Sequence, residues 1–181
     1  MSEFFDAFEI SPLSVVGPDT VAPEPFRGIY AMPMFVTVRT HDLVASTDFW
    51  VRGLGFIELF SVPEQVVHLR RWAFQDVLLV PADVNAPAPE QPSMHVAFSA
   101  VLSQLDGLVE RCDALLPGSA SAPSDTSWST REVTVTTPEG VQVVMTAARA
   151  IDPESPEGRA LATSGIVAPS ARAEGDNGAH D

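Results

Sequence analysis

Apolar and polar side chains alternate between residues 34 and 39, in the stretch MFVTVR, and β-branched residues are frequent there. This pattern predicts a β-strand with one buried face. Asp42 stands before apolar residues at helical spacing, so we expect it to cap a helix that runs from Leu43 to about Arg52. Three further strands are predicted in the segments FIELFSV, VVHLRRWAF and VLLVPA. The first half of the chain therefore has the predicted order β-α-β-β-β.

Two glycines and an aromatic pair mark the end of this first helix. We expect Gly53 to cap the helix in a left-handed conformation and Gly55 to allow a tight entry into the next strand. Phe49 is predicted to point into the core between helix and sheet. For Trp50 two interpretations stay open, because it either packs in the core or lines a ligand cleft or a dimer contact.

The same order of elements recurs after a proline-rich connector, ADVNAPAPEQPS. The segment MHVAFSA predicts a strand, and the residues that follow it carry apolar side chains at helical spacing up to Leu115. Two more strands are predicted around a turn at residues 138–140, and a fourth strand near Trp128 has only a weak pattern. The halves share an order of elements rather than a sequence, so the repeat is architectural.

Both ends of the chain differ in composition from this region. Residues 1–30 are rich in proline, which predicts an irregular arm that docks in part on the domain or on a partner. Residues 151–181 are small and polar and predict a disordered acidic tail, because they cannot bury enough apolar surface to offset ordering. A single domain is expected between them, over residues 31–150.

Charge and cysteine content narrow the class of partner. The net charge is −14 and every basic residue is arginine, a balance that disfavours nucleic acid. Two interpretations of this negative charge stay open: it attracts a cationic ligand, or it only keeps the protein in solution. No apolar run is long enough to cross a membrane, and the N-terminus lacks the basic start of a signal peptide. The single cysteine, Cys112, excludes an intrachain disulfide and fits a cytoplasmic location.

Two segments are similar to motifs of the vicinal oxygen chelate superfamily, which includes glyoxalase I, bleomycin-resistance proteins and extradiol dioxygenases. They are VRTHDLVASTDFWVRGLGF and SWSTREVTVTTPEGVQVVM. Ser129, Thr137 and Val141 depart from the family pattern, but Pro138 and Gly140 keep the turn. The resemblance implies an α+β fold in which two βαβββ modules form curved mixed sheets around a cleft.

Enzymes of this superfamily hold a divalent ion with His, Glu or Gln side chains from four strands of one curved sheet. In this sequence the four positions fall on Phe35, within residues 78–80, on His95 and on Val144. One histidine does not hold a catalytic ion tightly, so we expect neither a metal nor another cofactor. His95 is then the one candidate catalytic residue, as a hydrogen-bond donor or an acid/base. A semi-buried histidine with satisfied hydrogen bonds is the alternative.

Alternation along the strands extends the cleft from these positions. The predicted ligand-binding residues are Phe35, Thr37, Arg39, Trp50, Trp72, Phe74, His95, Ala97, Trp128, Gln142 and Val144. A mostly apolar lining with few polar groups is typical of a small-molecule site, and tryptophan faces suit aromatic or cationic ligands. Of the adjacent Arg70 and Arg71 only one can face the cleft, where we expect a solvated or dimer-edge arginine, with an anion anchor as the alternative.

These observations predict a metal-free small-molecule binding protein of the bleomycin-resistance type, which sequesters or carries an aromatic or cationic ligand such as an antibiotic. One alternative is a diverged lyase, isomerase or dioxygenase that uses His95 with or without a metal. Another is a protein-interaction module whose cleft is plugged by side chains. Small members of the superfamily are commonly homodimers, so the resemblance also implies a homodimer.

Overall fold

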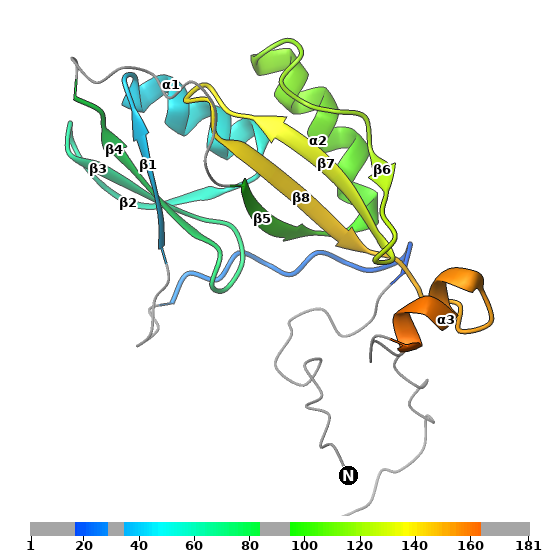
Figure 1. Ribbon diagram of the computed structural model, residues 1–181. Coiled ribbons are helices and arrows are strands. Elements are labelled where there is room, and N and C mark those ends of the chain that lie inside the picture. Colours follow the sequence, from blue (N-terminus) through cyan, green and yellow to red (C-terminus); the bar gives the residue numbers. More distant parts are fainter. Residues whose placement is uncertain (1–16, 29–34, 84–94, 164–181) are drawn as a thin grey trace, which may run out of the picture.

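The computed structural model describes residues 17–28, 35–83 and 95–163 (Figure 1). Within these ranges the two predicted β-α-β-β-β units are present, and each forms a four-stranded mixed sheet. The two sheets lie side by side, with helices α1 and α2 packed between and behind them. The fold is α+β, as predicted. No helix in the described ranges is long and apolar enough to cross a membrane.

The first module follows the pattern of its sequence closely. Its elements are β1 (Phe35–Thr40), α1 (Leu43–Asp48), η2 (Phe49–Gly53), β2 (Ile57–Val62), β3 (Val66–Arg70) and β4 (Asp76–Pro81). The strand order is β1-β4-β3-β2, with β1 parallel to β4 and the other neighbours antiparallel. Asp42 caps α1 as expected, since its Oδ1 accepts hydrogen bonds from the backbone N–H groups of Val44 and Ala45 at 3.1 and 2.9 Å.

The second module repeats this topology. Its elements are β5 (His95–Ala100), α2 (Leu102–Leu115), β6 (Ser124–Asp125), β7 (Thr130–Thr136) and β8 (Gln142–Ala148), in the sheet order β5-β8-β7-β6. β5 runs parallel to β8, as β1 does to β4. The strand with the weak pattern is β6, which has two residues and is therefore too short to show alternation. Trp128 lies in the turn that follows it.

The end of the first helix differs from the prediction. α1 continues into η2, a π-helical turn over Phe49–Gly53, and Gly53 is not left-handed. A Cβ on Gly53 would lie 3.2 Å from Sγ of Cys112 and 3.4 Å from Cδ1 of Leu115, both on α2. Gly55 supplies the left-handed conformation instead, with φ +79°. Gly53 is thus required for close helix packing, whereas Gly55 is required for the turn.

The core joins the two modules. Trp50 is 0% exposed, and its ring packs edge to face against Phe56 and Phe98, with centroids 5.1 and 6.3 Å apart. Phe98 belongs to β5 and Trp50 to η2, so this aromatic contact crosses the module boundary. Phe49 is buried as predicted. Burial raises the pKa of the Cys112 thiol to about 11, consistent with a small apolar role in the core.

Both terminal segments have structure within the described ranges. Residues 17–28 form an extended segment that runs below the two modules in Figure 1, and we call it the arm. Within the predicted tail, α3 (Pro156–Thr163) is helical, so residues 156–163 depart from the expected disorder. Leu161 is buried, and the hydroxyl of Ser155 accepts a hydrogen bond from the N–H of Gly158 at 2.9 Å. Burial and capping stabilise a helix that composition alone does not indicate.

Candidate functional site

Each sheet has one face against the helices and one open face. On β1 the side chains of Phe35, Thr37 and Arg39 are exposed, whereas Val38 and Thr40 are buried. We call the side that carries Phe35, Thr37 and Arg39 the first open face. The three residues were predicted to share one surface, and the structure places them so.

The second open face lies on the other sheet. His95 is paired with Gln142 and Ala97 with Val144 in the parallel register of β5 and β8, so the four side chains share one side. His95 and Ala97 are exposed, and Gln142 and Val144 are half-buried. The structure therefore brings together all four residues predicted for this sheet.

The remaining predicted ligand residues lie elsewhere. Trp50 is fully buried in the core and lines no cleft, because η2 turns it toward Phe98. Phe74 is 64% exposed in the turn between β3 and β4, where its φ is +63°, so it is not on a strand. Trp128 is also 64% exposed, in the turn before β7. Trp72 is buried and belongs to a different surface, described below.

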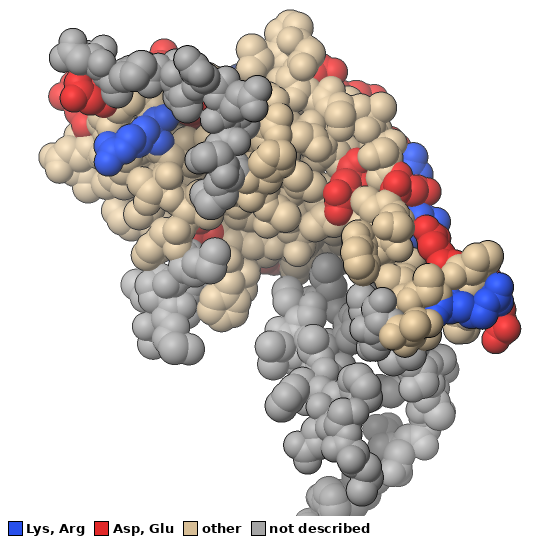
Figure 2. Space-filling model, in the orientation of Figure 1, with Lys and Arg blue, Asp and Glu red and all other residues tan. Residues whose placement is uncertain are grey.

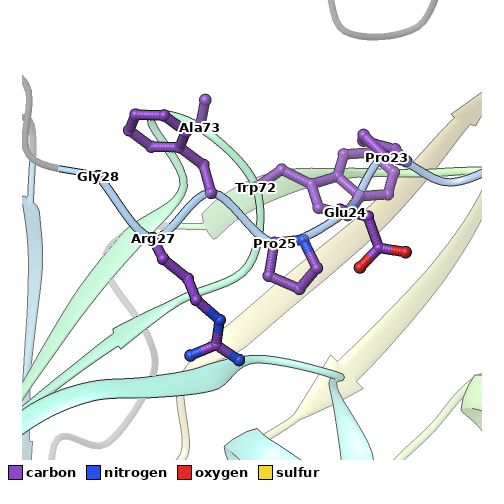
Figure 3. A pocket seen from close by; sticks show the side chains of 8 residues that line it. Pro23, Glu24, Pro25, Arg27, Gly28, Trp72 and Ala73 are labelled. Atoms are coloured by element: carbon purple, nitrogen blue, oxygen red, sulfur yellow. The ribbon is translucent and has the colours of Figure 1, made fainter.

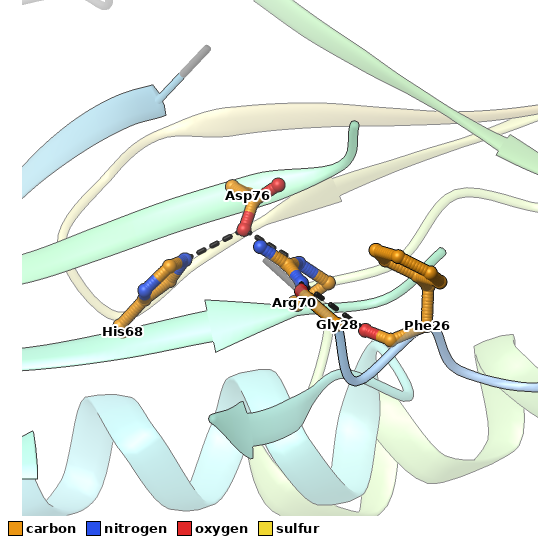
Figure 4. Close-up of polar contacts among 5 residues, drawn as sticks. All are labelled: Phe26, Gly28, His68, Arg70 and Asp76. Carbon is orange, nitrogen blue, oxygen red and sulfur yellow. Dashed lines mark hydrogen bonds and ion pairs between the residues drawn. The ribbon is translucent and has the colours of Figure 1, made fainter. Parts of the chain in front are cut away.

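The first open face holds a polar cluster that the sequence analysis missed. Oδ1 of Asp76 lies 2.6 Å from Nε2 of His68 and 2.8 Å from Nε of Arg70 (Figure 4). In the antiparallel register Arg70 pairs with Asp76, and His68 stands two residues before Arg70 on β3. We call His68, Arg70 and Asp76 the polar cluster. The i, i+2 spacing of His68 and Arg70 predicts that their side chains share one side of β3. The sequence does not show that Asp76 joins them, because this depends on the turn at residues 71–75.

Burial dominates the electrostatics of this cluster. The side chain of Asp76 is 0% exposed, and burial raises the pKa of its carboxyl to about 6. Burial, together with the charge of Arg70, lowers the pKa of His68. At neutral pH the carboxyl is therefore ionised and the imidazole is neutral. A neutral imidazole that is oriented by a carboxylate is suited to accept or relay a proton.

Two aromatic rings flank His68. Phe35 of β1 and Phe60 of β2 each have a ring centroid 5.2 Å from that of His68, and both rings stand nearly perpendicular to the imidazole. Phe35 is 42% exposed and Phe60 is 52% exposed. Exposed phenylalanine on both sides of a buried histidine gives the first open face an apolar surface with one polar centre.

The second open face is richer in hydroxyl groups. Oε1 of Glu132 accepts hydrogen bonds from the hydroxyls of Thr130 and Thr146, at 2.9 and 3.1 Å. Thr146 is paired with Ser99, which places the carboxylate on the same side as His95. The adjacent Arg131 points the other way, toward Asp125 at 3.8 Å. In Figure 2 charged side chains lie toward α3 and also at the opposite end of the molecule, and the middle shows few charges.

The residues at the superfamily's metal positions do not fit a divalent ion. Phe35, residues 78–80 and Val144 have side chains without a ligand atom, and His95 is the one donor among these positions. Within residues 17–28, 35–83 and 95–163, no three His, Cys, Asp or Glu side chains gather as a metal site would require. The polar cluster supplies one carboxylate and one imidazole, and Arg70 occupies the same carboxylate oxygen.

The arm docks beside the polar cluster. Nη1 of Arg70 donates to the backbone carbonyls of Phe26 and Gly28, at 3.2 and 2.5 Å, and the guanidinium lies 5.7 Å from the ring centroid of Phe26. A hollow of about 350 Å³ lies between the arm and the turn after β3 (Figure 3). It is lined by Pro23, Glu24, Pro25, Phe26, Arg27, Gly28, Trp72 and Ala73. Trp72 is the single predicted ligand residue in this lining.

Arg71 points to the opposite side of the strand and is also buried. Its Nη2 donates to Oε1 of Gln104 at 2.7 Å, its Nη1 to the carbonyl of Leu54 at 3.3 Å, and the guanidinium stacks on Trp72 at 4.9 Å. Burial, and secondarily Arg111, lowers the pKa of Arg71 to about 10, so it stays charged at neutral pH. The expectation of a solvated or dimer-edge arginine is wrong for both Arg70 and Arg71, because each connects segments of the fold.

Comparison with known proteins identifies the fold. No protein-family model and no curated protein matches the sequence. A mutant of the genomically encoded fosfomycin resistance protein FosX from Listeria monocytogenes, complexed with Mn(II) and 1S,2S-dihydroxypropylphosphonic acid, is 17% identical and has a TM-score of 0.54. That match covers 76% of this chain and 99% of FosX.

Two further solved structures agree with this match. A glyoxalase-related enzyme from Fulvimarina pelagi is 19% identical, with 71% of this chain and 96% of that chain covered and a TM-score of 0.52. A glyoxalase/bleomycin resistance protein/dioxygenase from Nocardioides is 20% identical, with 70% and 91% covered and a TM-score of 0.51. The predicted two-module fold is confirmed: this chain shares it with the glyoxalase-related and FosX structures.

Proposed function

We propose that this protein binds a small aromatic molecule on its open sheet faces and releases it unchanged, without a metal ion of the superfamily type. The observation that carries the proposal is that Phe35, residues 78–80 and Val144, where the resemblance implies metal ligands, have no ligand atom in their side chains. Such a surface can pack against a ligand and form hydrogen bonds with it. It lacks the positive charge of a bound metal ion, which would stabilise an enolate-like intermediate.

The exposed rings supply the driving force. Phe35 and Phe60 leave much of their surface in water, and a flat ligand that covers them removes apolar area at about 25 cal/mol per Å². Offset or edge-to-face contacts between rings add to this term. The cationic part of the sequence-based prediction rested on the net charge of −14 and on tryptophan faces, and the second of these supports is weaker because two of the three tryptophans are buried.

Binding is tested with the neutral fluorescent probe N-phenyl-1-naphthylamine. We expect saturable binding that weakens about tenfold in Phe35→Ser and Phe60→Ser, equivalent to roughly 1.4 kcal/mol for each ring. Phe74→Ser is the matched control, since Phe74 is exposed but lies in the turn between β3 and β4. Unchanged affinity in both variants of the open face, or equal loss in Phe74→Ser, contradicts this site.

Metal content and ligand recovery separate binding from catalysis. The protein purified without added metal is expected to contain less than one equivalent of nickel, zinc, iron or manganese, and a bound ligand is expected to return unaltered. A stoichiometric metal that is lost in His95→Ala would instead support the superfamily's metal chemistry, because His95 is the remaining donor at the expected positions.

A second candidate function is metal-free catalysis, and the hydrogen bond between His68 and Asp76 favours it. A histidine held by a carboxylate is an arrangement that removes protons from bound substrates. Recovery of a chemically altered ligand from the wild-type protein, but not from His68→Gln, would establish this alternative.

We also propose that the protein is a homodimer in which a second copy closes the first open face over the bound ligand. Apolar residues on the first module remain exposed in the single chain, namely Phe35, Phe60 and Val62. Contiguous exposure of this kind is typical of surfaces that meet a partner or a ligand. Sedimentation equilibrium is expected to give twice the chain mass, and a monomer at all concentrations would refute the dimer.

A further inference from the structure

His68 lies on the same side of the sheet as Phe35, with 7% of its side chain exposed, and its hydrogen-bonding state is defined by its neighbours. Arg70 has only donors, so the Asp76 oxygen that it contacts acts as an acceptor, and the same oxygen accepts from Nε2–H of His68. In a neutral imidazole the other ring nitrogen then carries a lone pair and no hydrogen. Figure 4 shows this second nitrogen of His68 directed away from Asp76.

The charges near His68 determine which ligand groups can donate a hydrogen bond to the lone pair on its Nδ1. An anion offers no hydrogen to Nδ1. A cation is opposed by the positive charge of Arg39, which is exposed on the first open face, whereas the guanidinium of Arg70 is paired with the ionised Asp76. The complementary group is a neutral donor.

The rings of Phe35 and Phe60 indicate which kind of ligand bears that donor group. Both rings stand nearly perpendicular to the imidazole with centroids 5.2 Å away, one on β1 and one on β2, so they flank His68 from two sides of the sheet. Their exposed area is covered best by another ring.

We infer that the ligand is a neutral aromatic ring bearing a hydroxyl group, whose O–H donates to Nδ1 of His68 while the ring packs against Phe35 and Phe60. This inference rests on the proposed function and narrows it from aromatic or cationic ligands to one chemical class. The carboxylate of Asp76 fixes the tautomer and is therefore a positioning residue. His95 has no part in the contact, since it lies on the second open face.

The test compares p-cresol with 4-methylanisole, which has the same ring but no hydroxyl hydrogen, by isothermal titration calorimetry. We expect p-cresol to bind about fivefold more tightly, the effect of one additional hydrogen bond. Tyramine, which adds an ammonium group to the same phenol, is expected to bind more weakly than p-cresol. Equal affinity for p-cresol and 4-methylanisole overturns this inference but leaves the proposed function intact, whereas failure of all three ligands to bind overturns both.

Variants assign the hydroxyl contact to one histidine. In His68→Phe the preference for p-cresol should fall to about one while 4-methylanisole still binds, because only the acceptor is lost. His95→Phe is the matched control and should keep the full preference. A preference that survives in His68→Phe, or disappears in His95→Phe, overturns the assignment.

A measurement on the wild-type protein keeps the inference testable if His68→Phe does not fold. In ¹⁵N NMR spectra of histidine-labelled protein, p-cresol should shift the Nδ1 resonance of His68, and 4-methylanisole should not. The His95 resonances should respond equally to both ligands. The same response of His68 to both ligands refutes the hydrogen bond.

Discussion

His68 of β3 and Asp76 of β4 are joined by a 2.6 Å hydrogen bond between Nε2 and Oδ1. The same carboxylate oxygen accepts from Nε of Arg70, and Arg70 in turn holds the carbonyls of Phe26 and Gly28 in the arm. One buried carboxylate thus organises a candidate binding residue and the docking of a distant segment. A substitution of Asp76 should therefore change the stability of the protein, its preference among ligands and the docking of the arm.

Asp76→Ala is expected to destabilise the protein by about 3 kcal/mol, because it leaves the buried Arg70 without the carboxylate that offsets its desolvation. Urea unfolding followed by far-UV circular dichroism measures the change in free energy. Asp48→Ala is the matched control, since Asp48 makes an exposed i, i+4 ion pair with Arg52 and should cost less than about 1 kcal/mol. A similar small loss in both variants would show that the polar cluster contributes little to stability.

The pH dependence of stability separates the two titrating groups of the cluster. Burial lowers the pKa of His68 below 6.5, so as the pH falls through 6.5 the unfolded chain binds the proton first and the folded state loses stability. Burial raises the pKa of Asp76 from 3.8 to about 6, so in that window the folded chain binds the proton first and gains stability as the pH falls. In the wild type the two effects oppose each other.

Asp76→Asn removes the second effect and should expose the first. Between pH 7 and pH 5 the variant is expected to lose more stability than the wild type, by about 1 to 2 kcal/mol in the unfolding free energy. Urea titrations at several pH values provide the measurement, and the double variant with His68→Gln should remove the extra slope. Parallel curves for Asp76→Asn and the wild type would mean that the pKa of Asp76 is not raised as described.

The order of elements could be predicted because it depends on local signals. Alternation on β1 and the cap at Asp42 each involve neighbours in sequence, and both agree with the structure. The roles of the two glycines could not be separated in this way. Whether Gly53 or Gly55 becomes left-handed depends on how closely η2 approaches Cys112, which is distant in sequence.

The candidate site was predictable only in part, for the same reason. Strand alternation correctly grouped His95 with Gln142 on one face. The polar cluster requires the exact length of the turn after β3, because one residue more or less would move Asp76 to the other side of the sheet. The burial of Trp50 likewise depends on packing between modules, which no local pattern reveals.

Gly55 provides a direct test of the revised helix end. Gly55→Ala is expected to cost about 1 to 2 kcal/mol, because alanine at φ +79° is strained, and Gly55→Asn should cost less. Gly107→Ala in α2 is the matched control and should be neutral or stabilising by up to about 1 kcal/mol, since its nearest neighbour is the flexible end of Arg111. Thermal and urea unfolding measure all three variants. A neutral Gly55→Ala would contradict the left-handed turn.

Docking of the arm should depend on Arg70. Trypsin can cleave after Arg27, which is exposed but is followed by Gly28, whose carbonyl Arg70 holds. In Arg70→Met the loss of these hydrogen bonds should raise the rate of cleavage at this site by about tenfold, because proteolysis follows the population of the released arm. Mass spectrometry of timed digests identifies the site and its rate.

Two comparisons distinguish release of the arm from general unfolding. Cleavage after Arg111 in the middle of α2 reports global opening, so the rate at Arg27 should be expressed relative to it. Arg39→Met removes an exposed arginine from β1 and should leave the ratio unchanged. If Arg70→Met raised cleavage at both sites equally, Arg70 would stabilise the whole domain rather than hold the arm, and the link from Asp76 to residues 26–28 would have no separate effect.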